Sequence, residues 1–331
     1  MKKILIPFIA AVILAGGYYV LKPANDFGAG KAGPEITIEV LAGQTGAQIG
    51  NSLERAGVIK AASTFINLAR RDSSANRIGP GTHRIQTHLP VKEALTQLLD
   101  QKRLADQVKI PEASTYGDVL AILKKSKNID SSARLNLKDL NPFLANPARS
   151  LEGQLFPAHY AFAPGTTVLQ ALSSMVNRFG ESARTTGISQ GYGKYSPYEV
   201  LTVASMVQIE GDPTDFEKVA RTIYNRLMIG MPLQLNSTVQ YAAHLRGRIT
   251  LSTTATQINS PYNTYRHTGL PPTPISNPSE AAVRAALHPI AGDWLYFITV
   301  APGDTRFTKN YSQFQEWEVL FHRNLKAGAF K

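Results

Sequence analysis

Hydrophobic and polar positions alternate over residues 36–41, where β-branched side chains are frequent, and this pattern predicts a strand. Residues 43–55 instead carry hydrophobic side chains at helical spacing, with a glycine soon after the last of them. The chain therefore starts its first folded module with a strand followed by a helix.

A second helix and a second strand complete that module. We expect Ser63 to cap a helix that runs to Arg71, and residues 81–85 to form a returning strand. The order strand–helix–helix–strand predicts a small βααβ module over about 36–88. A further helix at 91–102 is expected to follow it.

From Val108 onward, helical and strand patterns are mixed through to the end of the chain, without an internal repeat. We expect a helix within 161–179 and a polar, glycine-rich loop over 185–195. The two halves together predict an α+β fold. Its domains are the small one at 36–103 and a larger mixed α/β domain at 104–331.

The first residues predict a membrane segment. Residues 4–21 carry no charged side chain, and a helix of that length spans roughly 27 Å, enough for the hydrocarbon core of a bilayer. Lys2 and Lys3 favour a cytoplasmic start. We therefore expect residues 1–3 to be cytoplasmic, 4–21 to form a transmembrane anchor and 22–35 to be a linker.

A cleaved signal peptide is the alternative for this segment, because the small residues at 15–17 could precede a cleavage site. Tyr18 and Tyr19 lie where an interfacial aromatic belt is expected, which favours an uncleaved anchor. In either case the bulk of the chain is predicted to lie outside the cytoplasm.

Composition limits the classes of function. The net charge of +11 attracts anionic partners, but only residues 124–127 cluster lysines, and no aromatic residue lies among them, so nucleic-acid binding is not predicted. The absence of cysteine excludes disulfides and iron–sulfur clusters. The seven histidines show no pair at metal-ligand spacing and no phosphate-binding loop occurs, so we expect neither a metal nor a cofactor.

One predicted helix carries a candidate acid. Ser196 and Glu199 form a capping box with Pro197 at the first helical position. The stripe of Val200, Val203, Ala204 and Val207 continues to Glu210, and Gly211 follows as a helix stop. Asp212-Pro213 is expected to begin the next helix. Glu210 would thus lie in the last turn, on the buried side.

That position affects the chemistry of the carboxyl group. Apolar surroundings and the negative end of the helix dipole both raise the pKa of Glu210, as a general acid near neutral pH requires. The alternative is a surface glutamate at a frayed helix end. Periodicity alone leaves both interpretations open.

Several sequence blocks resemble the YceG-like family of endolytic murein transglycosylases, in the order that family has. They are LEGQLFP at 151–157, ASMVQIE at 204–210, Val219-Ala220, YNRL at 224–227, IGMPLQ at 229–234, PYNTY at 261–265 and GLPP at 269–272. The resemblance implies that the module at 36–103 is LysM-like and that 104–331 is the catalytic domain.

The resemblance also implies the activity. Glu210 would be the single catalytic acid/base that cleaves the MurNAc–GlcNAc β-1,4 bond of nascent strands and leaves 1,6-anhydroMurNAc ends, terminating glycan elongation. The implied partners are peptidoglycan strands and the cytoplasmic membrane, with peptidoglycan synthases as candidate partners. The alternative is a non-catalytic peptidoglycan-binding scaffold, since a fold does not guarantee an activity.

The chain departs from the family's pattern at several positions. A glutamate two residues before the catalytic one is Gln208 here, an aspartate is Asn236, and the residue after the LFP stretch is Ala158. The late block that contains a histidine in the family reads Thr305-Arg306-Phe307. Asn236 can still form hydrogen bonds but brings no charge.

Further residues are expected in or just behind the substrate groove. The proline-rich segment 260–278 would present flat tyrosine faces and an amide to sugar rings. For Arg226, an ion pair that supports the fold and a contact with sugar are both open. The candidates carried over from the resemblance are Glu152, Gln208, Asn225, Gln234, Asn236, Thr238, Tyr262, Asn263 and Tyr265.

The G-x-S-x-G string at 187–191 is not expected to be a serine-hydrolase site. Such a nucleophile elbow lies between a hydrophobic strand and a helix. Here a helical, polar stretch precedes the string and a glycine-rich loop follows it.

Overall fold

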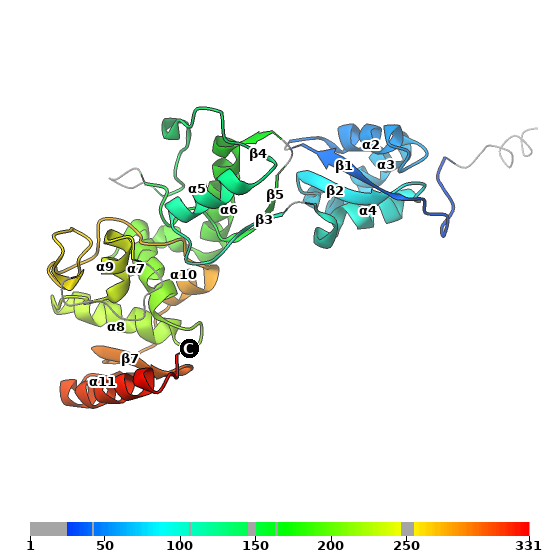
Figure 1. Ribbon diagram of the computed structural model, residues 1–331. Helices are drawn as coiled ribbons and strands as arrows, with labels where there is room; N and C mark the ends of the chain where they lie inside the picture. The colour runs from blue at the N-terminus through cyan, green and yellow to red at the C-terminus, as the bar shows by residue number, and fades with distance from the viewer. Residues whose placement is uncertain are drawn as a thin grey trace, which may run out of the picture. The chain divides into compact units, whose positions relative to one another are not determined.

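The computed structural model describes residues 25–41, 43–105, 107–144, 150–162, 165–245 and 255–330 (Figure 1). The predicted transmembrane anchor and the first part of the linker lie outside these residues. Among the helices of the described part, none combines the length and apolar character needed to span a bilayer. The chain divides into two compact units, with the main boundary at Gln107/Val108, and Ala161 and Phe162 belong to the first unit.

The first unit is built on a two-stranded antiparallel sheet. β1 (Glu35–Val40) pairs with β2 (Gly81–Gln86), with Glu35 opposite Gln86 and Val40 opposite Gly81. Between the strands lie α2 (Gly46–Arg55), α3 (Ala62–Arg71) and a 3₁₀ turn (Ser73–Arg77), and α4 (Val91–Leu99) follows β2. The predicted strand–helix–helix–strand order is confirmed.

The core of this unit forms where the hydrophobic pattern placed it. Leu53, Phe65, Ile85 and Leu89 have no exposed surface. Each buried aliphatic or aromatic side chain of this size contributes roughly 1.5–3 kcal/mol. One module thus buries a continuous core made from both strands and all three helices.

Two details of the first unit differ from expectation. Ser63 does not cap α3: the cap position is Ala61, which offers no side-chain hydrogen bond, and Ser63 lies inside the helix. The helix expected at 91–102 ends at Leu99, because the Asp100 side chain accepts from the Lys102 amide and starts a new 3₁₀ turn over Gln101–Arg103.

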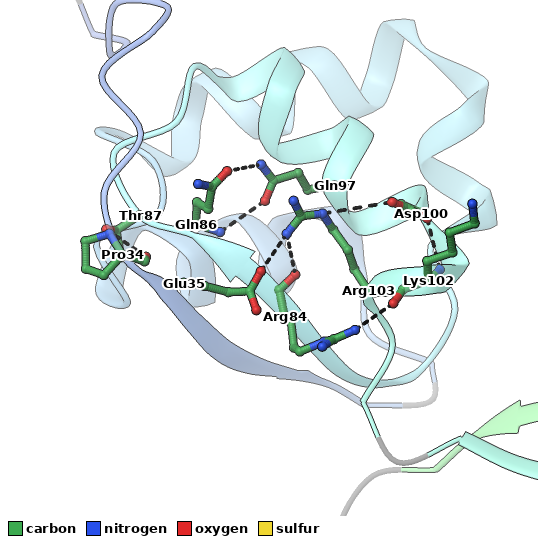
Figure 2. A network of polar contacts seen from close by, with 9 residues as sticks. All are labelled: Pro34, Glu35, Arg84, Gln86, Thr87, Gln97, Asp100, Lys102 and Arg103. Atoms are coloured by element: carbon green, nitrogen blue, oxygen red, sulfur yellow. Dashed lines mark hydrogen bonds and ion pairs between the residues drawn. The ribbon is translucent and has the colours of Figure 1, made fainter.

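A polar network fastens that 3₁₀ turn to the sheet (Figure 2). Arg103 Nη1 donates to Glu35 Oε2 at 2.9 Å and to the Arg84 carbonyl at 3.4 Å. Arg84 Nη2 in turn donates to the Lys102 carbonyl at 2.8 Å. These exposed contacts contribute little individually, but together they hold the end of the unit against both strands.

The second unit begins with short strands and two helices. β3 (Gln107–Ile110) pairs with β5 (Ala158–Ala161), and β4 (Ile129–Asp130) pairs in parallel with β6 (Thr166–Thr167). α5 is Tyr116–Lys125, a 3₁₀ turn covers Leu137–Asp139, and α6 is Val168–Thr186. This mixture of helices and short strands confirms the mixed α/β character predicted from Val108 onward.

α6 starts inside the expected range of 161–179 but continues beyond it to Thr186. Thr167 and Gln170 form a capping box that starts the helix at Val168, and Gly187 ends it with a φ of 76°. Residues 185–195 are therefore less loop-like than expected, since they include the end of α6 and a 3₁₀ turn at Ile188–Gln190. The G-x-S-x-G string follows a helix, not a strand, in agreement with its rejection as a nucleophile elbow.

The remaining elements complete the second unit. They are α7 (Pro197–Glu210), α8 (Phe216–Met228), α9 (Asn236–Ala242), a 3₁₀ turn at Ala255–Gln257, α10 (Glu280–Leu287), β7 (Tyr296–Ala301), β8 (Asp304–Thr308) and α11 (Tyr311–Lys326). α7 packs against α8 and α10, while α11 lies along the β7–β8 hairpin (Figure 1).

Candidate active site

α7 begins as the sequence predicted. The Ser196 side chain accepts from the Glu199 amide, the Glu199 carboxylate accepts from the Ser196 amide, and Pro197 is the first helical residue. Gly211 follows the helix with its amide bonded to the Val207 carbonyl. The capping box and the glycine stop are both confirmed.

The predicted apolar stripe was too narrow. Every residue of α7 from Val200 to Val207 is buried, including Thr202 and Ser205, because neighbouring elements cover this part of the helix on all sides. A helix surrounded in this way shows little periodicity. Its polar side chains bond to carbonyls within the helix, Thr202 to Tyr198 and Ser205 to Thr202.

The next helix starts later than expected. α8 begins at Phe216, not at Asp212-Pro213, and Asp215 holds its cap position without a side-chain hydrogen bond. The sequence spacing predicts an apolar stripe of Phe216, Val219, Ala220, Ile223 and Leu227; the first four are buried and Leu227 is half-buried. α7 packs against α8 and α9, and its end lies beside the first turn of α9.

Glu210 is the last residue of α7, half-buried at the wall of a pocket. The backbone amide of Ser237, in the first turn of α9, donates to Glu210 Oε1 at 3.2 Å. Burial raises the pKa of the Glu210 carboxyl above its ordinary value, while Ser237 and the positive charge of Arg226 oppose that rise. A carboxyl group in this setting holds its proton to a higher pH than an exposed glutamate does.

The pocket beside Glu210 has a volume of about 820 Å³. Volumes in this range are typical of sites that bind a small-molecule ligand. Its lining comes from the ends of α7 and α8, the start of α9, segment 256–265, β7 and α11. Elements far apart in the chain therefore meet at one carboxyl group.

Three of the sequence-predicted groove residues lie in this pocket with Glu210: Gln234, Asn236 and Tyr265. Tyr265 Oη donates to Asn236 Oδ1 at 2.7 Å. Gln234 has a φ of 48°, and its amide donates to the Thr264 carbonyl at 3.0 Å. That hydrogen bond fixes the turn before α9 against the segment that carries Tyr265.

Three other predicted groove residues are buried behind the pocket and do not line it: Thr238, Asn225 and Asn263. Thr238 Oγ1 donates to the Leu235 carbonyl at 2.8 Å, and Asn225 Nδ2 donates to the Trp294 carbonyl at 2.9 Å. Asn263 Nδ2 donates to the Thr256 and Ile258 carbonyls, while its Oδ1 accepts from the Tyr265 amide. These side chains shape the walls.

Tyr262, Glu152 and Gln208 also lie outside the lining. Tyr262 Oη is 2.9 Å from Thr273 Oγ1, and its ring packs on Tyr241. The buried Glu152 carboxylate accepts from the first backbone amide of α5, at Tyr116, and from Tyr241 Oη. Gln208 Oε1 accepts from the Ser279 amide at 2.7 Å, which ties α7 to the start of α10.

Arg226 lines the pocket but does not form an ion pair with Glu210 within the hydrogen-bonding range. Its Nε donates to the Leu295 carbonyl at 2.6 Å, its Nη1 donates to the Leu233 carbonyl, and its Cζ lies 5.6 Å from the centre of the Tyr296 ring. The guanidinium thus joins α8 to the segments before α9 and β7. Its charge remains close enough to act on Glu210.

Sequence reasoning missed the wall that β7 and α11 contribute. Tyr296 from β7 and, from α11, Tyr311, Phe314, Glu318 and His322 line the same pocket as Glu210. Positions 311, 314, 318 and 322 follow helical spacing, which could have placed them on one face. Burial raises the pKa of Tyr265 most, and the charges of Glu210 and Glu318 raise it further. Glu318 is therefore a second carboxylate facing this site.

Across the ranges that the structure describes, no cluster of three or more histidine, aspartate or glutamate side chains is arranged to hold a metal ion.

The pocket with one protonatable carboxyl group at a helix end defines a candidate acid/base site. The chain belongs to the YceG-like family, whose sequence pattern matches residues 38–318.

Curated relatives carry a more specific name. An endolytic murein transglycosylase of Bacillus subtilis is 38% identical over 173 residues, covering 52% of this chain and 48% of that protein. One from Streptococcus pneumoniae is 27% identical over 366 aligned positions, covering 98% of this chain and 66% of that protein. The chain thus spans between about half and two thirds of the length of these relatives.

A crystal structure of a yceG-like protein from Listeria monocytogenes superposes with a TM-score of 0.52 at 26% sequence identity. The superposition covers 85% of this chain and 98% of that one. The fold of the family therefore extends over most of this chain.

Proposed function

We propose that this protein is an endolytic lytic transglycosylase of peptidoglycan, with Glu210 as its catalytic acid/base. The observation that carries the proposal is the Glu210 carboxyl, which has a raised pKa and lies at the wall of an 820 Å³ pocket. Its relatives in Bacillus subtilis and Streptococcus pneumoniae bear the name of this activity.

In the proposed reaction, protonated Glu210 gives its proton to the oxygen that bridges MurNAc and GlcNAc. The bond to C1 breaks as an oxocarbenium-like transition state develops. The Glu210 carboxylate then takes the proton of the MurNAc 6-hydroxyl, whose oxygen closes onto C1. The products are a 1,6-anhydroMurNAc end and a free GlcNAc 4-hydroxyl, and no water is consumed.

The surroundings of Glu210 suit both halves of this cycle. Burial favours the protonated acid that starts the reaction. The Ser237 amide, 3.2 Å from Oε1, and the charge of Arg226 stabilise the carboxylate that forms when the proton leaves. The opposing effects allow one group to act first as an acid and then as a base.

The departure at Gln208 is compatible with this chemistry. Its amide oxygen accepts from the Ser279 backbone amide, and its Nε2 donates to Glu112 Oε2 at 3.3 Å. Neither Gln208 nor its two partners, Ser279 and Glu112, line the pocket that contains Glu210. Gln208 is therefore proposed to position α7 against α10, not to take part in proton transfer.

The finer expectations belong to the same proposal. The βααβ order of the first unit supports a LysM-like subdomain at 36–103 that binds glycan. The uncharged segment 4–21 supports a single-pass anchor that holds the catalytic domain on the outer side of the cytoplasmic membrane. Cleavage of nascent strands there would terminate their elongation, close to the synthases.

Mass spectrometry of glycan fragments tests the activity. Purified peptidoglycan strands are incubated with the protein lacking residues 1–25, and 1,6-anhydro ends at internal cleavage positions are the expected product. Binding of strands without any new ends would instead identify a scaffold protein, the alternative from another functional class. If the protein neither binds nor cleaves the strands, the proposal is refuted.

A further inference from the structure

Three aromatic rings form a cluster on the wall of the pocket opposite the end of α7. The Tyr296 ring centre lies 5.3 Å from that of Tyr311 and 5.3 Å from that of Phe314, and the rings of Tyr311 and Phe314 are nearly parallel at 6.2 Å. Tyr296 comes from β7, and the other two come from the first turn of α11. We call these three residues the aromatic platform.

The platform belongs to the same cavity as Glu210, because all three residues line the 820 Å³ pocket. Arg226 lies 5.6 Å from the Tyr296 ring on one side, with its guanidinium held by the Leu295 and Leu233 carbonyls. The orientation of Tyr296 is therefore fixed before any ligand arrives. A pre-positioned ring loses little entropy on binding.

Burial distinguishes the platform from a packing core. α11 contains no buried residue, and Tyr311 is 53% exposed. Aromatic side chains that only hold a helix in place would cover their rings, as Phe65 and Tyr224 do elsewhere in the chain. These rings instead leave aromatic surface open to the pocket.

We propose that the aromatic platform is a sugar-binding subsite, on which one pyranose ring of the glycan strand stacks beside the bond cleaved at Glu210. This inference rests on the proposed function. Pyranose rings present apolar C–H faces that pack on aromatic rings, while their hydroxyl and acetamido groups require polar partners at the edges. Glu318, on the same face of α11 and lining the same pocket, supplies an acceptor for such groups.

The choice of a sugar over other flat ligands follows from the charges at the site. Glu318 lines the pocket, and a carboxylate there disfavours the phosphates of a nucleotide or lipid headgroup. The guanidinium that could bind a phosphate already donates to two carbonyls. A neutral ring with hydroxyl groups fits this combination.

Tyr311→Ala tests the subsite, because that side chain is exposed and its loss should leave the fold intact. In a Glu210→Gln background, binding of peptide-free peptidoglycan strands is measured by titration. We expect the affinity to fall about tenfold, the scale of one aromatic stacking contact. Tyr311→Trp should retain binding. Val319→Ala, on the same helix, 62% exposed and outside the pocket lining, is the matched control.

The same variants in the protein with Glu210 intact separate the subsite from the activity. For Tyr311→Ala we expect a higher KM and a nearly unchanged kcat, with thermal melting unchanged. If the parent protein cleaves strands but Tyr311→Ala changes neither KM nor affinity, the proposed subsite is refuted and the proposed activity is retained. If the parent neither binds nor cleaves strands, both proposals are wrong.

Discussion

The backbone amide of Ser237 lies 3.2 Å from Glu210 Oε1 and donates a hydrogen bond to it. The contact links the last residue of α7 to the first turn of α9. It gives the carboxylate a donor supplied by the backbone, and the side chain of Ser237 also acts to lower the pKa of Glu210. The protonation state of Glu210 is therefore set by the packing of two helices.

Replacing Glu210 by glutamine should remove cleavage and leave the fold intact. The amide has nearly the same shape and can still accept from Ser237, but it cannot give up and regain a proton. General acid/base assistance contributes about 10²–10⁴ in rate, so the loss should be at least of that order. Initial rates and thermal melts measure both effects.

Glu217→Gln is the matched control for this substitution. Glu217 is exposed in the first turn of α8 and does not line the pocket. Its variant should cleave strands like the parent protein. Activity of the Glu210 variant within tenfold of the parent would assign the proton transfer to another group.

The raised pKa of Glu210 also predicts how stability depends on pH. The folded state holds the Glu210 proton to a higher pH than the unfolded state, where the pKa is near 4.5. The stabilisation is therefore full below about pH 4.5 and is lost as pH rises through the folded pKa. Glu210→Gln removes this loss, because its amide does not titrate.

We accordingly expect the difference in Tm between Glu210→Gln and the parent to grow in favour of the variant as pH rises from about 4.5. The activity of the parent should fall over the same rise, because the acid form is lost. Melting curves and rates between pH 4 and 9 check both. A difference in Tm that is constant with pH would mean that the pKa is not raised.

The helices that carry Glu210 could be predicted from local signals, but the full pocket could not. The capping box at Ser196 and the stop at Gly211 are short-range patterns, and both are confirmed. The boundaries failed where a different residue held the cap position, as Asp215 does before α8 in place of Asp212. Neighbouring polar residues compete for the cap position of a helix, and the periodicity of the hydrophobic residues does not show which of them will hold it.

The second wall of the pocket depends on contacts between distant parts of the chain. The spacing of Tyr311, Phe314 and Glu318 predicts that they share one face of a helix. It does not predict which other element that face will contact. Likewise, the resemblance marked Asn263 and Gln208 as groove residues without distinguishing a sugar contact from a support. Their hydrogen bonds to backbone groups make that distinction.

Asn263→Ala should reduce stability more than it changes substrate recognition. The side chain is fully buried and donates to the Thr256 and Ile258 carbonyls, which would lose their partner. A buried polar group left unsatisfied costs about 1–3 kcal/mol in the free energy of unfolding. Urea denaturation measures the loss, with Gln315→Ala on the exposed face of α11 as the control.

A different outcome would change the role of Asn263. An unfolding free energy equal to that of the parent, together with a large increase in KM, would mean that the amide binds sugar directly. The segment 255–265 would then have to rearrange on binding.

Deleting residues 1–25 should give a soluble, folded protein that keeps its activity on soluble strands. The deletion stops before Asp26, whose carboxylate accepts from the Val91 amide at the start of α4 with Oδ1 at 3.0 Å. Extending it through Asp26 should lower stability by about 1 kcal/mol, as for loss of a helix cap. Gel filtration and melting curves compare the two truncated proteins. Aggregation of the protein that lacks only residues 1–25 would contradict the expectation.

The last prediction concerns the source of the nucleophile. The acids nearest to Glu210 in sequence are Asp212, which is exposed, and Asp215, which holds the cap position of α8, and neither lines the pocket. The structure instead places Glu318 there, so a second carboxylate is present. If Glu210 works alone, the MurNAc 6-hydroxyl attacks from within the substrate, with an effective molarity that bulk water does not reach.

Digestion in ¹⁸O water should therefore give 1,6-anhydro ends without label, because no water oxygen enters the product. Glu318→Gln should leave that product unchanged and alter KM at most, since its carboxylate is proposed to contact the sugar and not the proton. Labelled reducing ends as the main product would identify a hydrolase. Their loss in Glu318→Gln would then make Glu318 the base that activates water, and the two-carboxylate mechanism would replace the one proposed here.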